Sequence, residues 1–71
     1  MMNIKNIKRY LSTCIGSKLI LIYDGGRNRK ERYDGVLLKL YNNVFTVKIY
    51  TGEIKSFSYI DILTKTVQIY I

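Results

Sequence analysis

Residues 35–50, G-V-L-L-K-L-Y-N-N-V-F-T-V-K-I-Y, decide the fold, because they read as two strands joined by a turn. In the second half, Phe45, Val47 and Ile49 are apolar and alternate with residues that carry polar groups. Successive strand residues point to opposite faces, so this pattern predicts a strand with one buried face. The pair Asn42-Asn43 predicts the turn, since asparagine tolerates the left-handed conformation.

The strand before this turn is expected to bend. Gly35 lies inside it, and the absence of a Cβ permits a bend or a bulge. The segment from Arg27 to Tyr41 has 15 residues. Strands usually have about 5–6 residues, so the segment must bend near Gly35 or begin as a loop. Regular alternation would place two sets of side chains on opposite faces of this strand. One face would carry Val36, Leu38 and Leu40, and the other would carry Leu37, Lys39 and Tyr41.

Two further strands are expected towards the end of the chain. Thr51-Gly52-Glu53 predicts a turn into a strand over residues 54–59. Residues 60–64 are too few for a helix and break the alternation. We therefore expect a single tight turn there, in which Asp61 caps the backbone amide of residue 63 or 64. Val67, Ile69 and Ile71 alternate with polar residues and predict the last strand.

The beginning of the chain reads as an amphipathic helix over residues 3–15. Apolar side chains at helical spacing would share one face: Ile4, Ile7, Leu11, Cys14 and Ile15. Asn3 is a suitable N-cap and Gly16 a suitable helix end. We expect Cys14 to be a small buried hydrophobe. Residues 18–23, K-L-I-L-I-Y, then predict a strand that is buried on much of both faces.

One helix and five short strands in 71 residues indicate an all-β fold with one N-terminal helix. Open sheet edges are costly, and a small sheet avoids them by curling until it closes. The order of the elements resembles the small SH3-type, or Sm-like, barrel. We therefore predict a single domain over residues 1–71, with the helix at residues 3–15 and a strongly bent five-stranded barrel at residues 17–71.

The stretch at residues 24–35, D-G-G-R-N-R-K-E-R-Y-D-G, is the most basic part of the chain. Its glycines predict a hairpin turn, because glycine accepts positive φ. A P-loop is excluded, since no glycine precedes a lysine-serine or lysine-threonine pair at the required spacing. The residues predicted to contact an anionic partner are Arg27, Arg29, Lys30, Arg32 and Tyr33, with a second basic patch at Lys5, Lys8 and Arg9. Alternation would place Arg27 and Arg29 on one side and Lys30 and Arg32 on the other. The alternative is a solvated hairpin tip.

The composition favours a binding protein. Twelve basic residues against five acidic ones give a net charge of +7, which attracts anionic partners and also aids solubility. The absence of histidine and the scattered carboxylates predict no enzyme, no metal and no cofactor. A single cysteine fits a reducing cytoplasm. No apolar run approaches the roughly 20 residues of a membrane span.

The sequence also resembles the Veg family of small bacterial proteins, from about Ile4 to Ile71. The resemblance rests on Ile7-Lys8-Arg9, Gly25-Gly26-Arg27, Gly35-Val36-Leu37 and, most specifically, on residues 56–67, S-F-S-Y-I-D-I-L-T-K-T-V. Some positions depart from the family pattern. Phe57 stands where a tyrosine is usual, Ile54 stands where an arginine is usual, and the acidic tail common in the family is missing. If this arginine or tail carries a contact in relatives, that contact cannot be assumed here.

The resemblance implies a non-enzymatic regulator that stimulates biofilm formation by raising transcription of matrix genes, through opposing a DNA-binding repressor. Such a protein would act by binding a protein in transcriptional control. The alternative is a small barrel that binds RNA or DNA directly through the basic hairpin, because basic groups among aromatic rings suit phosphates and bases. The sequence leaves the oligomeric state open, including a homo-oligomer.

Overall fold

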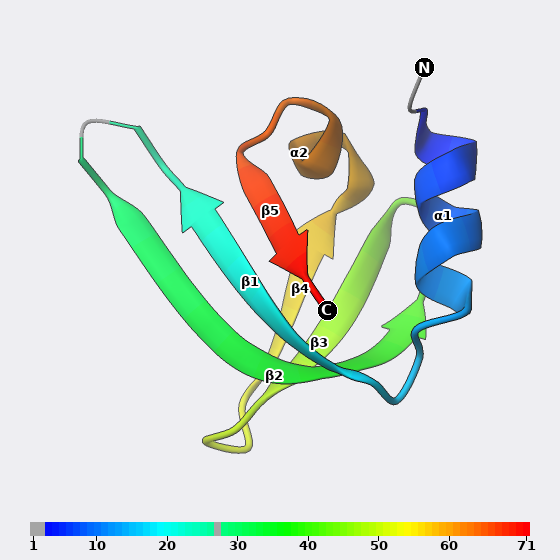
Figure 1. Cartoon of the computed structure of the whole chain (residues 1–71), viewed down its shortest axis with the longest axis horizontal. Coiled ribbons are helices and arrows are strands. Elements are labelled where there is room, and N and C mark those ends of the chain that lie inside the picture. Colours follow the sequence, from blue (N-terminus) through cyan, green and yellow to red (C-terminus); the bar gives the residue numbers. More distant parts are fainter. Residues whose placement is uncertain (1–2, 27) are drawn as a thin grey trace.

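A short helix packs beside a strongly bent antiparallel sheet in the computed structural model, which describes residues 3–26 and 28–71 (Figure 1). In chain order the elements are α1 (Ile4–Ser12), β1 (Lys18–Asp24), β2 (Lys30–Leu40), β3 (Val44–Ile49), β4 (Ile54–Ser58), α2 (Tyr59–Leu63) and β5 (Val67–Tyr70). The strand order is β4-β3-β2-β1-β5. The predicted class, mostly β with an N-terminal helix and five strands, is confirmed. Closure into a barrel stays a prediction.

β2 joins the two parts of the sheet, because its halves pair with different strands. Residues 30–36 pair with β1, and residues 35–40 pair with β3. Figure 1 shows the strand curving sharply between these regions. At the curve, a Cβ on Gly35 would overlap the carbonyl oxygen of Lys48 in β3. The close approach of two backbones therefore requires glycine where the sequence predicted the bend.

The regular alternation predicted for the second half of β2 is wrong. The register with β3 shifts between Leu37 and Lys39, which leaves Leu38 as the extra residue of a β-bulge. Leu37 is fully buried, and Leu40 packs on the same core although it lies three positions further along. The bulge shifts the alternation by one residue, so Leu37 and Leu40 face the same side although an odd number of positions separates them.

α1 begins where predicted but ends earlier. The side-chain oxygen of Asn3 accepts a hydrogen bond from the backbone amide of Asn6 at 2.8 Å, as an N-cap does. The helix ends at Ser12, and Gly16 then takes a φ of +87°. Ile15, expected on the buried face, is 50% exposed because helical spacing no longer applies beyond Ser12.

The segment predicted to be a tight turn forms the short helix α2, and the predicted cap is also wrong. Ser58 is the N-cap, and its Oγ accepts a hydrogen bond from the amide of Ile60 at 3.2 Å. Asp61 lies inside the first turn of the helix. There its carboxylate suits the partial positive charge of the helix N-terminus. The spacing S-x-x-D from Ser58 to Asp61 is a helix-start signal that predicts this outcome.

The core lies between the two helices and the inner face of the sheet. Its buried hydrophobic side chains are Ile7, Leu11, Cys14, Leu19, Leu21, Leu37, Phe45, Val47, Ile49, Tyr59 and Val67. Cys14 is thus a buried hydrophobe, as predicted. The hydroxyl of Tyr59 donates to the carbonyl oxygen of Tyr41 at 2.7 Å. In β1, Leu19 and Leu21 are buried, whereas Tyr23 on the same face and the side chains of the outer face are partly or fully exposed.

Candidate macromolecule-binding surface

The hairpin formed by β1 and β2 projects beyond the rest of the sheet (Figure 1). Its turn is closed by hydrogen bonds from the Gly25 amide to the Arg29 carbonyl at 2.8 Å and from the Arg29 amide to the Gly26 carbonyl at 2.9 Å. Gly26 has a φ of +79°, and its amide donates to a carboxylate oxygen of Asp24 at 3.1 Å. These glycines therefore serve the geometry of the turn. Arg27, predicted as a contact residue, lies outside the described residues.

The described cations of this hairpin are exposed. Arg29 lies in the turn, whereas Lys30 and Arg32 lie two positions apart in β2 and share its outer face. Arg32 Nε donates to a carboxylate oxygen of Asp34 at 2.9 Å, which raises the pKa of Arg32. Both side chains of this pair are at least half exposed, so the pair contributes little stability. Among the described residues, Arg29 and Lys30 take part in no ion pair.

Tyr33 lies on the inner face of the hairpin, apart from the cations of β2. It pairs with Leu21, which is fully buried, and residues paired across strands share a face. Its ring lies 5.9 Å from that of Phe57, and Lys55 Nζ lies 5.2 Å from its centre. The Tyr33 hydroxyl donates to Glu31, and this hydrogen bond, with partial burial, raises the pKa of Tyr33.

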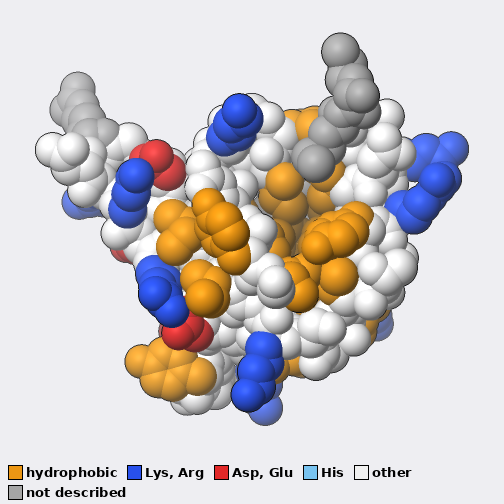
Figure 2. Space-filling model, viewed as in Figure 1, with side chains coloured by type: hydrophobic (Ala, Val, Ile, Leu, Met, Phe, Trp, Pro, Cys, Tyr) orange, Lys and Arg blue, Asp and Glu red, His pale blue; other side chains and the backbone are white. Residues whose placement is uncertain are grey.

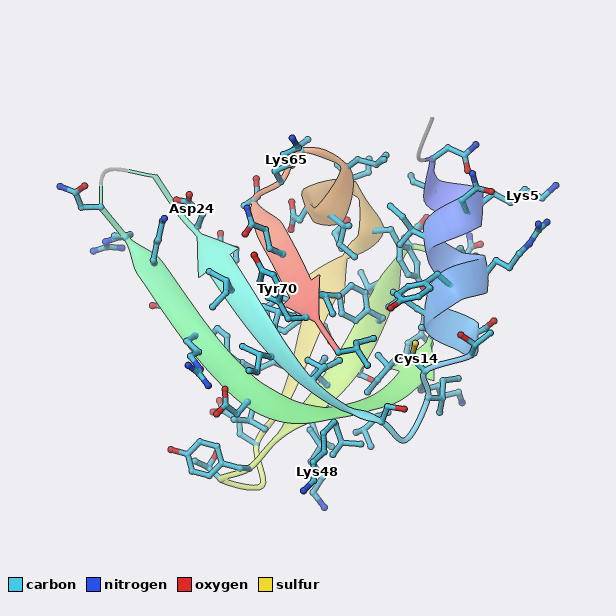
Figure 3. The ribbon with its side chains drawn as sticks, viewed as in Figure 1. Lys5, Cys14, Asp24, Lys48, Lys65 and Tyr70 are labelled. Carbon is cyan, nitrogen blue, oxygen red and sulfur yellow. The ribbon has the colours of Figure 1, made fainter. Side chains whose placement is uncertain are left out.

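The second basic patch lies on α1 and forms a separate surface. Lys5 and Arg9 are exposed, while Lys8 Nζ donates to the carbonyl oxygen of Asn42 at 3.3 Å. Figure 3 shows Lys5 on the opposite side of the molecule from Asp24, which ends the β1 arm of the hairpin. The hairpin and this patch therefore lie on different sides of the molecule.

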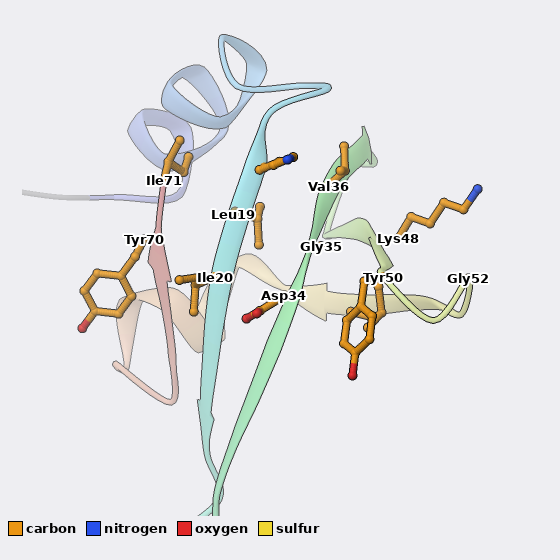
Figure 4. A pocket seen from close by; sticks show the side chains of 12 residues that line it. Leu19, Ile20, Asp34, Gly35, Val36, Lys48, Tyr50, Gly52, Tyr70 and Ile71 are labelled. Atoms are coloured by element: carbon orange, nitrogen blue, oxygen red, sulfur yellow. The ribbon is translucent and has the colours of Figure 1, made fainter.

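A third surface, which the sequence did not predict, is a groove of about 620 Å³ on the outer face of the sheet. We call it the outer groove. Its outward-facing side chains are Lys18, Ile20, Asp34, Val36, Lys48, Tyr50 and Tyr70, and Ile71 also lines it. Figure 4 shows Ile20 and Tyr70 on one side of Asp34, with Lys48 and Tyr50 on the other.

Strand pairing explains how the outer groove is built. Val36 stands opposite Lys18 of β1 on one side and Lys48 of β3 on the other, so the three side chains form a row across the sheet. The next row consists of Asp34, Ile20 and Tyr70. Figure 2 shows hydrophobic side chains gathered over β1 and β5, with charged side chains beside them. The outer face is therefore an apolar surface with a charged border.

A signal for this groove was present in residues 18–23, which are apolar at almost every position. That run predicted a strand buried on much of both faces. The structure instead leaves the face with Ile20 and Ile22 partly exposed. An apolar pattern shows that a face avoids water but does not show whether another element of the same chain covers it.

The described carboxylates do not form a cluster that could hold a metal ion. The chain's carboxylates are Asp24, Glu31, Asp34, Glu53 and Asp61. Within residues 3–26 and 28–71, no three side chains of histidine, cysteine, aspartate or glutamate gather as metal ligands. Over the same residues, no helix is long and apolar enough to cross a membrane.

Comparison with known proteins places the chain in one family. No curated protein matches the chain. The family described as "Biofilm formation stimulator VEG" matches residues 2–70. This range contains all five strands and both helices. The chain therefore belongs to the Veg family of biofilm formation stimulators.

Proposed function

We propose that this protein is a non-enzymatic regulator that acts in the cytoplasm by binding a protein of transcriptional control. The family match supports a regulatory role in biofilm formation. In this proposal the partner is a DNA-binding repressor, and binding it raises transcription of the biofilm matrix genes. The observation that carries the binding mode is the projecting hairpin with its exposed cations.

The acidic side chains of the hairpin make local contacts, and among the described residues none of them forms an ion pair with Arg29 or Lys30. Asp24 accepts a hydrogen bond from the turn backbone, Glu31 accepts one from a tyrosine hydroxyl on the inner face, and Asp34 accepts one from an arginine further along β2. Arg29 and Lys30 stay exposed at the end of the arm. An acidic protein surface is attracted by such a tip over a distance, which raises the association rate.

The protein partner can be tested with charge-matched variants. The hairpin variant carries Arg29→Gln and Lys30→Gln, and the control carries Lys5→Gln and Arg9→Gln, so both lose two positive charges. Pull-down from the native cytoplasm should recover one DNA-binding protein with the unmodified chain and the control. Capture by the hairpin variant should fall at least about threefold, the effect of about 0.7 kcal/mol of lost charge interaction. Equal capture, or recovery of ribosomes and RNA alone, would contradict the proposal.

Direct binding of nucleic acid is the second candidate function. It is favoured by the exposed rings of Tyr50 and Tyr70, which lie on the same outer face as Lys30 and Arg32. Phosphate-binding cations and stacking rings on one face are typical of proteins that bind single strands.

Salt dependence separates this candidate from the first. Retardation of DNA or RNA should weaken steeply as salt rises. Changing Arg27, Arg29 and Arg32 to alanine should flatten the slope of log K against log salt by up to about 0.9 for each lost phosphate contact on duplex DNA. If the unmodified protein retards neither DNA nor RNA at low salt, this candidate is excluded.

A further inference from the structure

We propose that the outer groove binds a protein segment in which a large apolar side chain stands next to acidic residues. The inference rests on the proposed function in one respect, since it takes the partner to be a protein. It adds a second contact surface and the chemistry that the partner presents there.

The apolar part of the groove has room for a large side chain. Ile20 and Val36 are partly buried at neighbouring positions of the two central strands. Tyr50 is 82% exposed and Tyr70 57% exposed, so two large rings stand in water at the sides of the groove. A volume of about 620 Å³ falls within the roughly 300–1,000 Å³ of binding pockets. An exposed apolar surface bordered by polar residues typically marks an interaction site.

The charges around the groove favour an acidic occupant. Lys18 and Lys48 flank Val36 in one cross-strand row, and each is directly opposite it. Opposed residues have Cβ atoms about 4.5–5.5 Å apart, so carboxylates of a segment lying over Val36 can reach both ammonium groups. Neither lysine forms an ion pair among the described residues. Asp34 already accepts the hydrogen bond of Arg32, so the groove stays positive.

Other occupants fit this surface less well. A second copy of the chain would bring two bodies of net charge +7 together and set Lys18 and Lys48 against like charges. The phosphate backbone of duplex DNA or RNA would satisfy the lysines but would press polar groups against Ile20 and Val36. A single strand that stacks bases on Tyr50 and Tyr70 belongs to the second candidate function, and with that occupant the acidic peptide of the test below would not bind. A segment that is apolar and acidic satisfies both parts of the groove.

The test is an NMR titration of the isotope-labelled protein with three short capped peptides. The first, E-D-L-F-D-E, is apolar and acidic; K-K-L-F-K-K keeps the apolar pair, and E-D-S-S-D-E keeps the acidic residues. Only the first should shift the amide signals of Ile20, Val36 and Lys48. Equal shifts with either of the other peptides, shifts confined to the hairpin tip, or no shifts with any peptide would overturn the proposal.

Substitutions at the groove give a second test of the same binding. Lys18→Gln with Lys48→Gln should weaken the affinity for the first peptide about tenfold, or about threefold for each lysine. The control Lys65→Gln, charge-matched to each single lysine variant, should change it by less than about twofold, because Lys65 lies between α2 and β5, on the opposite side of the molecule from Lys48 (Figure 3). Val36→Thr keeps the size of the side chain and adds a hydroxyl, and it should weaken binding several-fold. Thermal unfolding confirms that each variant is folded. An unchanged affinity of the lysine variant overturns the proposal.

This inference and the proposed function can fail separately. If the hairpin variant loses the captured partner but the groove binds no peptide, the proposed function stands and the groove assignment is wrong. If the groove binds the first peptide while the hairpin variant captures its partner normally, the hairpin assignment is wrong and the groove assignment stands.

Discussion

At the scale of single residues, Gly35 occupies a position that has no room for a side chain. A Cβ there would overlap the Lys48 carbonyl oxygen and would lie 3.0 Å from Val47 Cγ1. The first obstacle is backbone, which cannot rotate away as a side chain can. Gly35→Ala should therefore lower the free energy of unfolding by about 2 kcal/mol or more. The midpoint of denaturant unfolding measures this change.

Gly25→Ala is the matched control for this substitution. A Cβ at Gly25 would meet the Tyr23 ring at 3.2 Å, and that ring can move because it is partly exposed. The cost should stay below about 1 kcal/mol. If both variants unfold at the same denaturant concentration, the contact at Gly35 does not constrain the sheet.

Two tyrosines make stability depend on pH in the alkaline range. Burial raises the pKa of Tyr59, and the hydrogen bond to Glu31 raises that of Tyr33. The folded protein therefore holds these protons more tightly than the unfolded chain does. Their contribution is complete below about pH 10, the ordinary pKa of tyrosine, and is lost as the pH rises through the raised values.

Thermal unfolding between about pH 8 and pH 11 measures this loss. Tyr59→Phe should make the decline shallower, and at neutral pH it should cost about 1 kcal/mol because the hydrogen bond to Tyr41 is removed. Tyr10→Phe, at an exposed tyrosine, should leave the profile unchanged. A decline as steep in Tyr59→Phe as in the unmodified protein would show that other groups cause it.

At the scale of elements, α2 depends on its cap because it has only five residues. Ser58→Ala removes the acceptor for the Ile60 amide and should lower the free energy of unfolding by about 1 kcal/mol. Ser56→Ala in β4 is the control, since Ser56 is exposed, and it should change stability by less than about 0.5 kcal/mol. Equal denaturant midpoints for the two variants would contradict this role of Ser58.

The elements differ in how far the sequence predicts them. α1 and β3 follow from short-range rules, an N-cap at Asn3 and strict alternation at residues 45–49. The bulge at Leu38 does not, because it depends on how β2 fits β3 across the bend. α2 was predicted as a turn because its length is below that of an ordinary helix, although Ser58 and Asp61 carried the start signal.

At the scale of the whole molecule, the sequence located the basic hairpin but not the faces of its residues. Tyr33 belongs to the inner face because it pairs with Leu21, and that register follows from the length of the turn. The sequence signalled the apolar face of β1 but not the outer groove itself. Its row of Lys48, Val36 and Lys18 joins three strands, and only the sheet order brings them together.

The sheet order also has a consequence for how the chain folds. β1 pairs with β2, its neighbour in the chain, and with β5, the last strand. The other strand pairs join neighbours and can form early, whereas joining β5 to β1 must close a long loop. Until then the apolar run of β1 offers an unpaired edge to any other molecule. The yield of refolding should therefore fall as protein concentration rises. Pairing of β5 with β1 is the step that covers this edge and prevents association of partly folded chains.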